Sequence, residues 1–156
     1  MLEALSRGAF ERELAQLDKR VVARRNWTVL TAQHPVLDVV FNHPTRAALR
    51  LRFTCDGWDD QPPLIEILAA DGQPVPSHRR PGHPHEYVFA GGLSIFNSGP
   101  HERHQRPFIC MRGSRDYHNH SSHRTDHWDN YRGQSGNSLL GLLEQLWRVW
   151  TRAAGQ

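Results

Sequence analysis

The 156-residue sequence has no apolar run approaching the roughly 18 residues that a membrane-spanning helix needs. Its N-terminal stretch mixes charged with apolar residues, whereas a secretory signal would be continuously apolar, so we expect a cytoplasmic protein with no membrane partner. Only two cysteines occur, Cys55 and Cys110, which excludes a disulfide framework. Lysine is almost absent too, since Lys19 is the only one.

Disorder is not indicated, because 38% of the residues are hydrophobic and five are tryptophan. The length is typical of one globular unit, and we predict a single domain over residues 1–156. The net charge of +3 is small, and the arginines are scattered rather than gathered on one element. We therefore expect no nucleic-acid partner.

The opening segment predicts an amphipathic helix, because its apolar residues recur at steps of three and four with charged residues between them. These apolar residues are Phe10, Leu14, Leu17 and Val21. Four short β-rich runs follow, with proline-containing turns between them, and predict an antiparallel meander. The runs are residues 27–30, 36–41, 48–53 and 64–68.

The second half of the chain is richer in predicted loops. Residues 71–86 are rich in Pro, Gly and His and are interpreted as a loop. Residues 112–137 hold few apolar side chains and predict a long polar loop, with Trp128 and Tyr131 as anchors that pin it to the domain. Short β-type runs occur at residues 87–89, 93–96 and 108–111, the last of which includes Cys110.

The chain closes with leucines and tryptophans at helical spacing, which predict a helix with a broad buried face that begins near Asn137 or Ser138. The stripe consists of Leu139, Leu142, Leu143, Leu146, Trp147 and Trp150. An N-terminal helix, a four-stranded antiparallel meander, a cysteine-bearing loop and a C-terminal helix indicate an α+β domain.

This order of elements resembles the fold of ubiquitin-conjugating enzymes. The run LRLRFTCDGWDDQPPLIEIL is similar to that family's third strand, proline-containing turn and fourth strand, and RPFICM is similar to the stretch around its catalytic cysteine. Trp128 and the leucine-rich helix resemble the tryptophan and helix that come after that cysteine. The family's His-Pro-Asn motif is absent, and the segment between Cys110 and Trp128 is longer and rich in histidine. A longer stretch before Cys110 leaves room for an inserted hairpin around YVFAGGLSIF.

In these departures the chain resembles bacterial conjugating proteins from ubiquitin-like gene clusters linked to phage defence. The resemblance implies that Cys110 accepts the C-terminal acyl group of a ubiquitin-like modifier from an activating enzyme, holds it as a thioester and passes it to an amine of a target protein. It implies no cofactor and no metal. Nearby cationic groups would favour the reactive thiolate, and by sequence proximity the candidates are His101, His104, Arg106 and Arg112.

Other interpretations remain open at this point. Cys110 could be a plain core residue, or it could be a zinc ligand together with polar residues of the segment that follows it. The candidate ligands are His118, His120, His123, His127, Asp116 and Asp126, although their spacing matches no standard zinc signature. Those histidines could also simply form local hydrogen bonds or take a direct part in catalysis. An inactive conjugating-type scaffold that only binds partners is a third possibility. For Cys55, which ends an alternating run before a turn, we predict a packing role.

Overall fold

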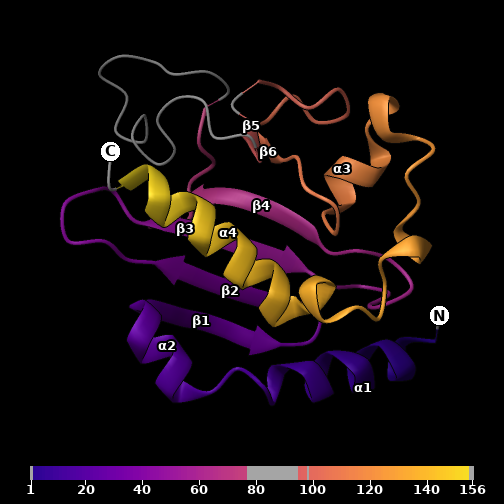
Figure 1. Cartoon of the computed structure of the whole chain (residues 1–156), viewed down its shortest axis with the longest axis horizontal. Coiled ribbons are helices and arrows are strands. Elements are labelled where there is room, and N and C mark those ends of the chain that lie inside the picture. Colours follow the sequence, from indigo (N-terminus) through magenta and orange to yellow (C-terminus); the bar gives the residue numbers. More distant parts are fainter. Residues whose placement is uncertain (1, 77–94, 98, 155–156) are drawn as a thin grey trace.

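The computed structural model of the chain describes residues 2–76, 95–97 and 99–154, and it confirms the predicted α+β architecture (Figure 1). The N-terminal helices are α1 (Glu3–Leu14) and α2 (Lys19–Arg25). One antiparallel sheet, in the order β1-β2-β3-β4, is formed by β1 (Trp27–Gln33), β2 (Val36–Phe41), β3 (Leu49–Thr54) and β4 (Leu64–Ala69). A second pair of strands consists of β5 (Phe96–Asn97) and β6 (Phe108–Ile109). After them come α3 (Arg115–Asn119), three 3-10 helices and α4 (Leu139–Ala154).

The four-stranded meander follows directly from the alternation in the sequence. In β3 the side chains of Leu49, Leu51 and Phe53 are buried, while the residues between them are half-exposed. Because strand side chains point alternately to the two faces of a sheet, this pattern places the three apolar side chains on one face. Phe53 pairs with Leu37 on β2 on one side and with Ile65 on β4 on the other, so the same face is apolar across three strands.

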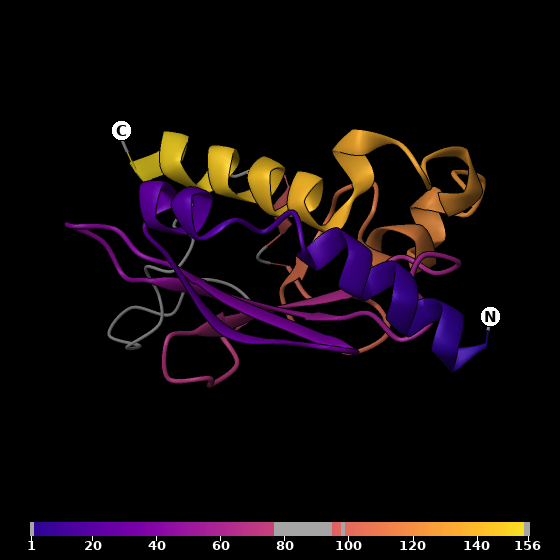
Figure 2. The ribbon, with the colours of Figure 1, turned by 90° about the horizontal axis from the view of Figure 1, so that it is seen from below.

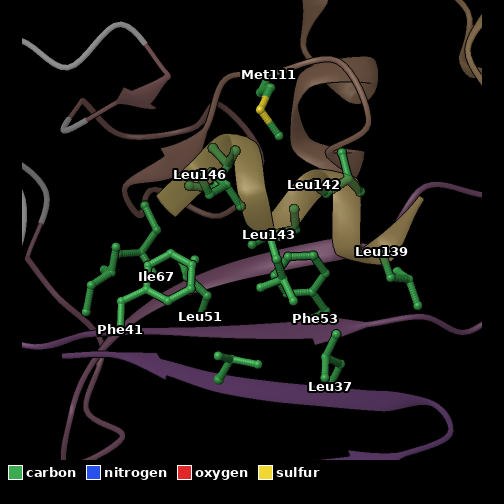
Figure 3. Packing of buried hydrophobic residues seen from close by; sticks show 14 of the residues in the cluster. Leu37, Phe41, Leu51, Phe53, Ile67, Met111, Leu139, Leu142, Leu143 and Leu146 are labelled. Carbon is green, nitrogen blue, oxygen red and sulfur yellow. The ribbon is translucent and has the colours of Figure 1, made fainter. Parts of the chain in front are cut away.

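Helix α4 lies across that apolar face (Figures 1 and 2). Its predicted stripe is confirmed, because every member except Trp147, which is partly buried, is fully inaccessible to solvent. Figure 3 shows side chains of α4 next to those of the strands, and Met111, the neighbour of Cys110 in the chain, joins the same cluster. Ser138 precedes the first residue of α4 and caps the helix as predicted, since its hydroxyl accepts a hydrogen bond from the backbone N–H of Gly141. None of the described helices is both long enough and apolar enough to cross a membrane.

The prediction of one continuous N-terminal helix was wrong. The chain leaves α1 after Leu14 and begins α2 at Lys19, with Asp18 as the N-cap whose carboxylate accepts a 2.7 Å hydrogen bond from the N–H of Arg20. Aspartate is favoured at an N-cap because it satisfies a backbone donor that has no partner inside the helix. The break still leaves Phe10 fully buried, and α1 contacts α4 while α2 contacts β1.

The segment over residues 112–137 is not the continuous loop that the sequence predicted. It contains α3 and the 3-10 helices η1 (Ser121–His123), η2 (Trp128–Asn130) and η3 (Ser135–Asn137). These turns are local and short, so they need no apolar stripe to form, and hydrophobic periodicity does not reveal them. Residues 77–94 lie outside the described part of the chain. This range takes in most of the predicted loop at 71–86, the run at 87–89 and most of the hairpin around YVFAGGLSIF.

Trp128 anchors this segment to the connection between β3 and β4, which agrees with the predicted anchoring role. Its ring is 6% exposed and lies 5.8 Å from the ring of Trp58, which is itself buried. The indole N–H donates a 2.7 Å hydrogen bond to the carbonyl of Asp59, so the polar atom of the ring is also satisfied. These contacts hold the chain in place at Trp128, between Cys110 and α4.

Candidate active site

The two cysteines have opposite environments. Cys55 follows β3, is fully buried in the core and has a thiol pKa that burial raises strongly, so the predicted packing role fits. Cys110 follows β6 and is only partly buried. Its backbone N–H donates a 2.7 Å hydrogen bond to the carbonyl of Ile95, which holds the residue beside the β5–β6 pair. Cys110 is therefore the cysteine that solvent can reach.

The side chain next to the Cys110 sulfur is His123. The chain turns through α3 and η1 after Cys110, and this path returns the His123 imidazole so that its Nε2 lies 3.8 Å from Sγ of Cys110. Burial raises the pKa of the Cys110 thiol, which favours the protonated, weakly nucleophilic form. A cysteine in this state reacts faster when a neighbouring group can take its proton.

The ring of His123 is held by Tyr117 of α3. The two rings are stacked, with centroids 3.9 Å apart and planes 19° from parallel. The Tyr117 hydroxyl donates a 2.6 Å hydrogen bond to Oδ2 of Asp126, and the Tyr131 hydroxyl donates to Oδ1 of the same carboxylate. Arg112 donates from Nε to Oδ2 at 2.9 Å. The two hydroxyls and the guanidinium hold the pKa of Asp126 well below its usual range.

His118 contributes to the same region but not to the sulfur. Its Nδ1 donates to the carbonyl of Asp126 at 2.7 Å, and its Nε2 accepts from the N–H of Gly113 at 3.1 Å. Since a neutral imidazole has one donor and one acceptor, both nitrogens are used. Burial lowers the pKa of His118, in keeping with the neutral form. This histidine links the segment just after Cys110 to the Asp126 turn.

His101 and His104, which the sequence placed near Cys110, have Asp116 as their common partner. Nε2 of His101 lies 2.9 Å from the Asp116 carbonyl, and Nε2 of His104 lies 3.0 Å from Oδ2 of the same residue. Their rings stack with centroids 4.7 Å apart, and His101 is completely buried. In the described structure the imidazole within hydrogen-bond distance of the Cys110 sulfur is that of His123, and neither His101 nor His104 has such a contact.

His101, His104 and Asp116 form the one group of three potential metal ligands among the described residues, with candidate ligand atoms within 4.8 Å of one another. The hydrogen bonds argue against a metal there. Nδ1 of His101 accepts from the N–H of Arg103, and Nδ1 of His104 accepts from the N–H of Arg106, both at 3.1 Å. Each Nε2 must then hold the proton, so a metal at Nε2 would leave two backbone donors without an acceptor.

The two arginines proposed from sequence proximity are paired elsewhere. Arg106 forms an ion pair with Glu66 of β4 at 3.3 Å, and Arg112 is bound to Asp126. Neither has a described contact with the Cys110 sulfur. The fold and this site thus define the class of the molecule as an α+β protein with a partly exposed cysteine–histidine pair at the end of a short strand.

Comparison with known proteins adds one match. A family model described as Y4jH-like matches residues 94–153 of the chain. That range includes Cys110, His123, Asp126 and nearly all of α4, but it leaves out the four-stranded meander. No curated protein matches the chain.

The sequence interpretation missed the pairing of His123 with Cys110 and the role of Tyr117 and Asp126 around it. It named Asp126 as a possible zinc ligand, and it considered His123 only as one of several histidines that could bind zinc, form local hydrogen bonds or take part in catalysis. The signal in the sequence was weak, because thirteen positions separate Cys110 from His123 and the turns between them have no hydrophobic pattern. The high number of histidines after Cys110 was the one feature of the sequence that indicated this segment.

Proposed function

We propose that this protein is a conjugating enzyme for a ubiquitin-like modifier and that Cys110 holds the modifier as a thioester. An activating enzyme supplies the acyl group, and an amine on a target protein receives it. The order of elements, the Pro62-Pro63 pair before β4 and the position of Cys110 after it support this proposal through their resemblance to ubiquitin-conjugating enzymes.

The observation on which the proposal chiefly rests is the state of Cys110. It is the partly exposed thiol of the pair, and its Sγ lies within 3.8 Å of an imidazole nitrogen. Acyl transfer through a thioester needs a sulfur that a large partner can reach and that can lose its proton when the acyl group arrives. Cys55 meets neither requirement, since it is fully buried and its thiol pKa is strongly raised.

The test is a charging assay with the activating enzyme and modifier encoded beside this chain's gene, together with ATP. We expect wild type to form an adduct that a reducing thiol cleaves, because thioesters exchange with thiols whereas amides do not. Cys110→Ala should abolish the adduct. Cys110→Ser should give either no adduct or an oxyester that resists thiols, because a hydroxyl is a far poorer nucleophile.

Cys55→Ala is the matched control for this assay. It removes the other thiol from the core and is expected to lower stability, but it should leave the adduct intact at a temperature where circular dichroism shows the variant to be folded. An adduct that persists in Cys110→Ala, or one that maps to Cys55, would disprove the assignment. Wild type that never charges would disprove the proposed function.

A further inference from the structure

We propose that His123 is the catalytic base that takes the proton of Cys110, with Tyr117 and Asp126 as positioning residues that hold its ring. The role of His123 in acyl transfer rests on the proposed function. Its action on the Cys110 proton is a property of the two side chains alone and can be measured without the modifier.

The first argument is the geometry of the pair. Nε2 of His123 lies 3.8 Å from Sγ, within the range of a hydrogen bond that involves sulfur. A base must be within reach of the proton that it removes, and this nitrogen is. Burial raises the pKa of Cys110, so the thiol must lose its proton to a neighbour in order to become a nucleophile near neutral pH.

The second argument is that the His123 ring is held from a direction that leaves Nε2 directed at the sulfur. Tyr117 stacks on its face at 3.9 Å, and the hydroxyl of Tyr117 is bound to Asp126. Asp126 is in turn held by Tyr131 and Arg112 from other parts of the segment. This arrangement orients the base through stacking, where other enzymes use a direct hydrogen bond from a third group.

The titratable groups that face His123 are compatible with this role. They are Cys110, Tyr117, His118 and His120, whose ring centroid is 6.0 Å from that of His123. Burial and the hydrogen bond to Asp126 raise the pKa of Tyr117, so this phenol stays neutral. His118 is neutral as well, because burial lowers its pKa. No carboxylate forms an ion pair with His123 in the part of the chain that the structure describes. A neutral imidazole has one nitrogen free to accept a proton and can return it, which suits the role of a base.

The acyl-transfer steps balance with one proton on His123. The Cys110 S–H proton moves to Nε2, the sulfur forms a bond to the acyl carbon of the activating enzyme's thioester, and the departing thiolate of that enzyme takes the proton from Nε2. In the second step an amine N–H proton moves to Nε2, the C–N bond forms and the C–S bond breaks. The Cys110 thiolate then recovers the proton, so His123 is regenerated each time.

The experiment measures alkylation of the purified full chain by iodoacetamide as a function of pH, with mass spectrometry to follow Cys110. We expect wild type to react already below pH 7, in addition to a rise that lies above the ordinary thiol pKa of about 8.5 because burial raises the pKa of Cys110. His123→Gln should slow alkylation at pH 7 on the order of tenfold and leave only this rise at high pH. Tyr117→Phe keeps the stacked ring without its hydroxyl and should give an intermediate profile.

His127→Ala is the matched control, because His127 is an exposed histidine of the same segment without a described side-chain contact. It should alkylate like wild type. A His123→Gln profile equal to that of wild type would overturn the proposal. So would a wild-type profile with only the rise at high pH, a result that needs no variant to fold. If charging fails but the alkylation contrast holds, the proposed function is wrong and the proton transfer from Cys110 to His123 stands.

Discussion

At the scale of single residues, the described histidines after residue 100 differ in what their ring nitrogens contact. His101, His104 and His118 each have both nitrogens in hydrogen bonds, with at least one backbone group among the partners. These bonds fix the tautomer of each neutral ring and tie distant parts of the segment together. His123 differs, because its described hydrogen-bond partner is the thiol of Cys110. The segment from His101 to His127 therefore contains three rings held at both nitrogens and one ring beside the Cys110 thiol.

This division predicts that the purified protein holds much less than one equivalent of zinc. Metal at His101 and His104 would have to displace the proton of each Nε2 while the two Nδ1 atoms face backbone N–H donors, which disfavours binding. Elemental analysis after purification without chelator checks this. One equivalent of tightly held zinc that is lost in His104→Ala but retained in the exposed-site control His127→Ala would contradict it.

At the scale of elements, α4 and the sheet depend on each other. The leucines of α4 fill the apolar face formed by β2, β3 and β4, and the segment that includes Cys110 rests on the same cluster through Met111 (Figure 3). The site thus rests on the main hydrophobic core, although its residues come from short turns. The N-terminus of α4 is also tied to α1, because the backbone N–H of Leu139 donates to Glu13 at 2.7 Å.

Leu143→Ala should destabilise the fold by about 2 to 5 kcal/mol, because it removes a fully buried side chain and leaves a cavity against the sheet. Urea unfolding followed by circular dichroism measures the change. Leu30→Ala is the matched control, since Leu30 on β1 is 48% exposed, and its effect should stay within about 0.5 kcal/mol. Equal losses for the two variants would mean that α4 does not cover the sheet in solution.

At the scale of the whole molecule, the opposite face of the sheet has its own polar centre. Asp38 of β2 is 2% exposed and accepts hydrogen bonds from Arg50 at 2.7 and 2.9 Å and from Arg52 at 3.2 Å. Burial alone would raise the pKa of Asp38, but the hydrogen bonds from the two guanidinium groups outweigh it and lower the pKa. A carboxyl with a lowered folded-state pKa stabilises the fold above its unfolded value of about 3.9, and this stabilisation is lost as the pH falls through the folded value.

Asp38→Asn should therefore destabilise the protein by roughly 3 kcal/mol at pH 7, because it leaves two arginines without their buried partner. The difference from wild type should narrow below about pH 4, because the carboxyl takes up a proton there in the unfolded wild-type chain and, at still lower pH, in the folded one. Urea unfolding over a pH series measures both effects. Asp129→Asn serves as the control, since Asp129 is 78% exposed and 3.6 Å from Arg132. A gap that stays constant down to pH 2 would refute the assignment to Asp38.

Local patterns in the sequence were sufficient for the main elements. The alternation in β3 and the helical stripe from Leu139 to Trp150 each show which face of the element is buried. Each pattern can be recognised within a short stretch of consecutive residues. The burial of Cys55 and the anchoring by Trp128 could be predicted for the same reason. The break at Asp18 could not be predicted, because the apolar steps continue through it. Only the N-cap at Asp18 shows where the second helix begins.

The contacts of the candidate site were decided by tertiary structure alone. Whether Cys110 meets His101, His104 or His123 depends on how α3 and η1 turn the chain, and hydrogen bonds from polar side chains set that path. Hydrophobic periodicity contains no information about it, since these turns bury few apolar side chains. The sequence by itself therefore determined the α+β framework and the segment that contains the partly exposed thiol of Cys110. The choice of its partner was left to the tertiary structure, because a contact between polar groups thirteen positions apart depends on the full three-dimensional course of the chain.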